Sequence, residues 1–127
     1  KDDYMEKSRL KDGTEFELIP MGIDNKDKLR IIKFISDLTH AEILDKFSEA
    51  NIEKVEYILA DETIGTTYED CTVMKSLTFI PNAQVTNNTI SDIYMVVIST
   101  DAVERGMQTL KTEVDNIVNA IAIMSIM

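Results

Sequence analysis

The pattern of apolar and polar positions in residues 10–18 predicts a β-hairpin. Asp12 and Gly13 stand between two short alternations, and both residue types tolerate the positive φ that tight hairpin turns require. Phe16 and Leu18 then point to one face of the second strand, and the glutamates between and beside them point to the other. We therefore expect a half-buried strand of an antiparallel sheet here.

Further strands are predicted where β-branched and aromatic residues gather between turn residues. The strand that holds Phe16 and Leu18 should stop at Pro20 and Gly22, and a polar turn is expected at residues 24–27. The remaining strands are expected at residues 29–35, 52–59, 66–80 and 90–100, with turns at 61–65 and 87–88. The segment 66–80 is long enough for two strands or for one bent strand.

Two helices are predicted from capping boxes, in which a Thr or Asp precedes a Glu by three residues. Thr39 and Glu42 begin a short helix, and Asp101 and Glu104 begin a second one. Apolar residues then recur at alternating steps of four and three, which is the heptad spacing of a coiled coil. This C-terminal apolar series comprises Val103, Met107, Leu110, Val114, Ile117, Ile121 and Met124.

The C-terminal apolar series predicts association through residues 103–124. A helix that packs on its own domain usually shows a broader stripe with a 3.6-residue period, so the strict register favours contact with another helix. The mixture of Val, Ile and Leu in the seam leaves both dimer and trimer open. The added apolar residues at 118–127 imply that the tip enters a larger bundle or contacts another protein.

Together these elements predict an α+β fold in the order β-β-α-β-β-β-α. We expect a small, mainly antiparallel sheet or partly closed barrel with one short helix, followed by a long C-terminal amphipathic helix. Residues 9–100 would form the α+β domain and residues 101–127 the assembly helix. Residues 1–8 are left out because the chain begins with Lys rather than Met, and Met5 is a candidate native start.

Composition narrows the classes of partner. The formal net charge of −10 and the sequence pI near 4.4 argue against binding to nucleic acid or to an anionic membrane, because both would be repelled. No stretch of 18 apolar residues is present to cross a membrane. A single cysteine excludes an intrachain disulfide. An intracellular or virus-particle setting fits these features.

Residues able to carry catalysis or to bind a cofactor are few. His40, the only histidine, occupies the second position of a capping box, which explains it as a surface residue of a helical turn. Cys71 lies in an apolar stretch with only Lys75 as a nearby basic residue, so we expect a buried structural thiol. No EF-hand loop, zinc set or phosphate-binding glycine motif is present. We therefore expect no enzyme activity, no metal and no cofactor.

The layout of the chain resembles small uncharacterised structural proteins of phage and prophage tail modules from low-GC Gram-positive bacteria. The resemblance spans most of residues 9–124 and implies a non-enzymatic component present in several copies in a baseplate, neck or tail. It supplies no functional residues. The segments that carry it are residues 10–18, the helix that begins at Thr39 and Glu42 and ends in Asp45-Lys46-Phe47-Ser48, residues 52–59, Tyr68-Glu69-Asp70-Cys71-Thr72, and the last strand with the heptad helix after it.

Two functional hypotheses follow. The first is a structural assembly protein that associates with itself or with other particle proteins through residues 103–124, in a virion or phage-like particle assembled in the bacterial cytoplasm. The alternative is a cytoplasmic adaptor or chaperone-like module that holds a partner helix. The second hypothesis predicts a monomer when the protein is alone, whereas the first predicts a dimer or trimer.

Overall fold

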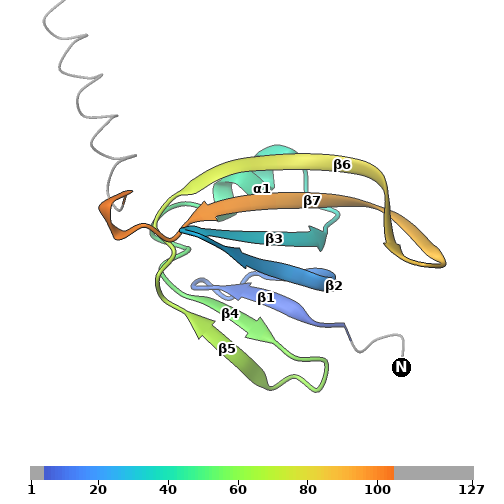
Figure 1. Ribbon diagram of the computed structural model, residues 1–127, viewed down its shortest axis with the longest axis horizontal. Coiled ribbons are helices and arrows are strands. Elements are labelled where there is room, and N and C mark those ends of the chain that lie inside the picture. The colour runs from blue at the N-terminus through green and yellow to red at the C-terminus, as the bar shows by residue number, and fades with distance from the viewer. Residues whose placement is uncertain (1–4, 105–127) are drawn as a thin grey trace, which may run out of the picture.

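Residues 5–104 fold around one antiparallel sheet of seven strands in the order β5-β4-β1-β2-β3-β7-β6. We describe residues 5–104 of a computed structural model. The helix α1 lies against one face of the sheet near β6 and β7, β5 forms the opposite edge, and the β6–β7 hairpin extends beyond the other strands (Figure 1). The elements are β1 (Lys7–Leu10), β2 (Glu15–Lys26), β3 (Leu29–Ile35), α1 (His40–Lys46), β4 (Val55–Ile58), β5 (Ile64–Tyr68), β6 (Met74–Thr86), β7 (Thr89–Ser99) and the 3-10 helix η1 (Ala102–Glu104).

The predicted hairpin joins β1 to β2, with Arg9 opposite Glu15. Gly13 adopts a φ of +93°, a conformation that L side chains rarely tolerate. The Asp12 carboxylate accepts a hydrogen bond from the backbone N–H of Thr14 at 2.9 Å. This hydrogen bond is the main reason that the pKa of Asp12 falls to about 2. The turn prediction is therefore confirmed in its atomic contacts.

The strand β2 does not stop at Pro20 and Gly22 as expected. It continues to Lys26, and its register with β3 shifts between Leu18 and Ile23, which marks a bulge. Bulges let extra residues leave the ladder while pairing resumes beyond them. The turn between β2 and β3 accordingly lies at residues 27–28 rather than at 24–27.

The segment predicted at 66–80 contributes to two strands, β5 and β6. The strand β6 runs past Pro81 to Thr86, beyond residue 80, where the predicted segment ended. Because β6 is at the edge of the sheet, one side of its backbone has no neighbouring strand, and a proline without an N–H is tolerated there. The backbone N–H of Asn82 donates to the Asp92 carboxylate at 2.9 Å, and the register shifts at this point.

The short helix begins as the capping box predicts. The Thr39 hydroxyl accepts from the Glu42 backbone N–H at 3.1 Å, and the Glu42 carboxylate accepts from the Thr39 N–H at 2.8 Å. This second contact lowers the pKa of Glu42. Ile43 is fully buried. The apolar side of α1 therefore packs against the sheet.

The core lies between α1 and one face of the sheet, which we call the core face. Phe16 on β2 and Phe34 on β3 have ring centroids 4.5 Å apart, and Phe47 stacks on both rings from the end of α1. The buried cluster comprises Leu10, Phe16, Leu18, Ile32, Phe34, Ile43, Phe47, Ile52, Val55, Cys71, Val96 and Ile98. These side chains come from segments far apart in sequence, and they unite the hairpins and α1 around one core.

The expected fold class, α+β with a long C-terminal helix, is wrong. Residues 5–104 form a mainly β structure with one short α-helix, and at residues 102–104 only a single 3-10 turn follows β7. Residues 105–127, where most of the expected helix would lie, are outside the described residues. The prediction underestimated the lengths of β2 and β6, because it ended these strands at proline or glycine. A bulge and an edge position accommodate these residues within the strands.

Candidate protein interaction surface

Strand pairing divides the side chains of the sheet between two faces, because directly paired residues point to the same side. The core face includes Phe34 and its partner Tyr94 on β7. The opposite face, which we call the open face, includes Lys33 and its partner Met95. The single α-helix of residues 5–104 packs on the core face. The open face therefore has no α-helix over it in the described part of the chain.

One part of the open face, on β4, β1 and β2, satisfies its charges internally, and we call it the charged half. Arg9 donates through Nε to Glu56 at 2.8 Å, and its Nη1 lies 3.6 Å from Glu15. The Lys7 Nζ lies 3.7 Å from Glu15 and 3.3 Å from Glu62. The Glu56 side chain is only 8% exposed, and the hydrogen bond from Arg9 lowers its pKa. These carboxylates are held by neighbouring cations.

The other part of the open face, on β3 and β7, is the apolar half. Ile31 pairs with Val97, and Lys33 pairs with Met95. Ile35 lies two positions further along β3, on the same side. All five side chains are half-buried, and Ile93, two positions before Met95 on the same side, is only 3% exposed. A continuous aliphatic strip surrounding one lysine is a surface that gains free energy when a partner covers it.

Lys33 and Glu17 make no ion pair with another described residue along the border of the two halves, although Glu17 is the direct cross-strand partner of Lys7. Glu17 on β2 pairs with Ile35, so it lies diagonally from Lys33 on the same face. Within residues 5–104 neither side chain makes a hydrogen bond or an ion pair. The border therefore carries a half-buried lysine and an exposed glutamate.

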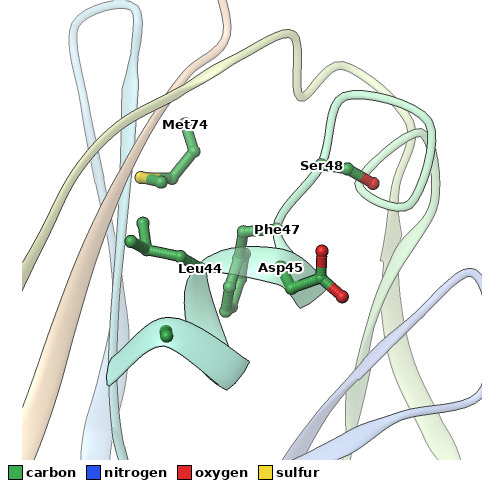
Figure 2. A pocket seen from close by; sticks show the side chains of 6 residues that line it. Leu44, Asp45, Phe47, Ser48 and Met74 are labelled. Carbon is green, nitrogen blue, oxygen red and sulfur yellow. The ribbon is translucent and has the colours of Figure 1, made fainter. Parts of the chain in front are cut away.

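A second surface feature is a hollow of about 450 Å³ between α1 and the start of β6. Figure 2 shows Leu44 and Met74 on one side of it and Asp45 and Ser48 on the other. Leu44 is 40% exposed, while Phe47 is buried. No histidine lines the hollow, and the ionisable side chain in its lining is Asp45. An apolar side chain next to a cation would fit this lining.

His40 lies where the sequence predicted, as the exposed first residue of α1. Its Nε2 is 3.3 Å from the backbone oxygen of Leu77, and its ring centroid is 6.5 Å from that of Tyr94. These contacts join the beginning of α1 to β6 and β7. They give His40 a structural role.

Arg30 is a buried charged residue that sequence reasoning missed. It is 7% exposed, its Nε donates to the Asn25 side-chain oxygen at 2.7 Å, and its Nη1 donates to Asp70. Its guanidinium carbon stands 3.8 Å from the centroid of the Tyr68 ring. This arrangement ties the segment after β5 to β3 through a charge pair and a cation–π contact.

Cys71 is fully buried in the core, as predicted. The basic residue beside it is Arg30, whose Nη1 lies 3.5 Å from the Cys71 sulfur. Because Arg30 precedes Cys71 by 41 positions, no local sequence signal could have identified this contact. From the sequence alone, Lys75 was the basic residue expected near Cys71.

In residues 5–104, no group of three His, Cys, Asp or Glu side chains is placed to hold a metal ion. None of the described helices combines the length and apolar character needed to span a membrane.

Among the predicted interaction residues, only Val103 falls within the described part of the chain. It is 80% exposed in η1, and its backbone N–H donates to the Asp101 carboxylate at 3.0 Å. The predicted cap at Asp101 thus starts a helical turn. The remaining members of the C-terminal apolar series lie outside the described residues, namely Met107, Leu110, Val114, Ile117, Ile121 and Met124.

Comparison with known proteins gives no relative for this chain: no family model, no curated protein and no solved structure matches it.

Proposed function

We propose that this protein is a non-enzymatic structural protein that acts in several copies through protein–protein contacts. The observation that carries the proposal is the apolar half of the open face, an aliphatic strip around Lys33 that no described α-helix covers. Apolar surface of this kind favours contact with a protein partner. The charge of −10 favours protein partners over nucleic acid or an anionic membrane.

The particle proposed as its setting is a phage or phage-tail-like particle, assembled in the bacterial cytoplasm, in which the protein belongs to the baseplate, neck or tail. The resemblance of the sequence to phage tail-module proteins supports this assignment. Other particle proteins are therefore partners in addition to further copies of the chain.

The C-terminal apolar series is proposed as one association element. The test uses the full chain with Ile117→Asp, which places a charge within the series, and with Asn116→Asp as a control that adds the same charge beside it. We expect Ile117→Asp to lower the solution mass measured by light scattering on a sizing column. Asn116→Asp should leave that mass unchanged, and circular dichroism should show the same β content in all three proteins.

A monomeric wild-type protein at every concentration would contradict the proposal. It would favour the second candidate, a cytoplasmic adaptor that binds a partner protein. The observation in favour of that candidate is the hollow lined by Leu44, Phe47 and Met74, with Asp45 at its rim, which could accept an apolar side chain next to a basic one.

A further inference from the structure

We propose that residues 105–111 of the chain bind in the hollow between α1 and the start of β6 of the same molecule, with Met107 and Leu110 against its apolar lining. Residues 112–127 then remain for association with other proteins or other copies. The contact is made within one molecule, so it does not depend on the proposed self-association and can fail separately from it.

The first argument is that the described part of the chain ends beside the hollow. The Glu104 carboxylate pairs with the Lys75 Nζ at 2.8 Å, and the residue before Lys75 is Met74, which lines the hollow. Met107 and Leu110 follow Glu104 by three and six positions, and chains of those lengths span at most about 11 and 22 Å. Since Met74 is both the neighbour of Lys75 and part of the lining, both side chains have the hollow within reach.

The second argument is the apolar lining. Leu44 is 40% exposed although α1 packs on the core face, and Met74 lies on the same side of the hollow (Figure 2). An exposed leucine beside a methionine gains free energy when another apolar side chain covers both. Met107 and Leu110 are the first apolar residues after Val103. They are therefore the nearest side chains along the chain that can supply this cover.

The third argument is charge complementarity. Asp45 lies at the rim of the hollow and makes no hydrogen bond or ion pair in the described part of the chain. Residues 105–111 carry two cations, Arg105 and Lys111, and no acidic residue, although the net charge of the whole chain is −10. Residues 112–127 carry two acidic residues and no base. Of the sequence beyond the described residues at this end, only 105–111 complements the Asp45 carboxylate.

The test is a tryptophan reporter in the full chain, which has no tryptophan of its own. In Met107→Trp we expect blue-shifted emission and weak quenching by acrylamide, because the indole lies in the apolar hollow. Adding Leu44→Asp places a charge in the hollow, so the emission should shift to the red and the quenching constant should rise severalfold. Ile64→Asp is the matched control. Ile64 is 51% exposed on β5, at the opposite edge of the sheet from β6, and the same charge there should change neither value.

Protein concentration separates contact within one molecule from association. The emission of Met107→Trp should not change with concentration and should be the same when Ile117→Asp is added, because no second copy is needed. A tryptophan that is buried only at high concentration would overturn the proposal. So would a tryptophan that is exposed at every concentration, or one that stays buried with Leu44→Asp. If the tryptophan is buried while Ile117→Asp leaves the solution mass unchanged, the proposed association fails and the contact in the hollow stands.

Trypsin provides a second readout that keeps the natural Met107. Binding in the hollow should slow cleavage after Arg105 and Lys111, and Leu44→Asp should speed both cleavages severalfold, because proteolysis requires the segment to leave the hollow. Cleavage after Lys54, in an exposed loop, is the internal reference and should be unchanged. Equal rates of cleavage after Arg105 and Lys111 in the wild type and in Leu44→Asp would contradict the proposal.

Discussion

The charged half and the apolar half of the open face lie on neighbouring strands of one sheet, but their side chains find partners differently. In the charged half, Arg9 and Lys7 contact carboxylates within the molecule, and Glu56 is buried under these contacts. In the apolar half, Lys33 stands among aliphatic side chains with no ion pair in residues 5–104. A surface whose charges are paired internally gains little from a partner, because desolvating those pairs is costly. An aliphatic surface gains by being covered.

This difference assigns two expected roles to one sheet. The charges of the β4–β1–β2 side are paired within the molecule, and the aliphatic strip on β3 and β7 is the surface that we propose for association. Substitutions in the two halves should therefore have different consequences. We expect substitutions in the apolar half to weaken association, and substitutions in the charged half to lower folding stability.

The largest effect is expected from Val97→Asp in the apolar half. When a partner covers the apolar half, a carboxylate at this position would be buried without a counter-charge, at a cost of about 3 kcal/mol, which weakens association roughly 100-fold. Sedimentation equilibrium measures it. Thr67→Asp, on the open face of β5, adds the same charge beyond the charged half and should associate like the wild type. Equal weakening by both substitutions would remove the distinction between the halves.

A smaller effect, on folding stability, is expected at the bulge in β2, where the two halves meet. A Cβ at Gly22 would stand 2.6 Å from the backbone oxygen of Lys33 and 2.8 Å from that of Ile19. Since backbone atoms cannot yield as side chains do, Gly22→Ala should lower the free energy of unfolding by about 2 kcal/mol, measured by urea denaturation.

Gly65→Ala on β5 is the matched control for Gly22→Ala. Its added methyl meets side chains alone, Leu59 at 3.0 Å and Tyr57 at 3.2 Å, and side chains can shift where backbone atoms cannot. We expect a clearly smaller loss of stability. If Gly65→Ala were as damaging as Gly22→Ala, the close approach of β2 to the Lys33 backbone would not be what limits this position.

The smallest effect is expected from Arg9→Met in the charged half. Glu56 would remain buried without its cation, so the melting temperature at neutral pH should fall by a few degrees while association is unchanged. Lys11→Met, which removes a more exposed pair with Glu53, should have less effect. Differential scanning calorimetry measures both.

The pH dependence of the Arg9→Met effect has a defined sign. The hydrogen bond from Arg9 lowers the folded-state pKa of Glu56 below its ordinary value of 4.5. A carboxylate with a lowered pKa stabilises the fold above its ordinary pKa, and this contribution disappears as the pH falls through the lowered value. The difference in melting temperature between wild type and Arg9→Met should therefore shrink below pH 4.5. A difference that grew in acid would show that Arg9 does not act through Glu56.

Predictions from the sequence were accurate where the signal was local. The turn at Asp12 and Gly13 and the capping box of Thr39 and Glu42 depend on hydrogen bonds between residues at most three positions apart, and both formed as expected. Strand ends were predicted less well. Whether a proline such as Pro81 ends a strand depends on whether the strand has a neighbour on that side, which is a property of the whole sheet.

The candidate surface was not visible in the sequence for the same reason. Lys33 appears there as one polar residue within an apolar strand, and Arg30 as another. Their alternate positions on β3 place Arg30 in the core beside Asp70 and Lys33 on the open face beside Met95. Periodicity places the two on opposite faces, but it does not say which face is covered.

The sequence by itself determined the local elements of this protein: its tight turn, its helix cap, most of its strands and its acidic net charge. Only the tertiary structure decided which faces those strands present and which charges meet. The physical reason is range. Capping and turn formation act between neighbours along the chain, whereas pairing of β3 with β7, and the burial of Arg30 against Asp70 forty positions later, depend on how distant segments align their backbones.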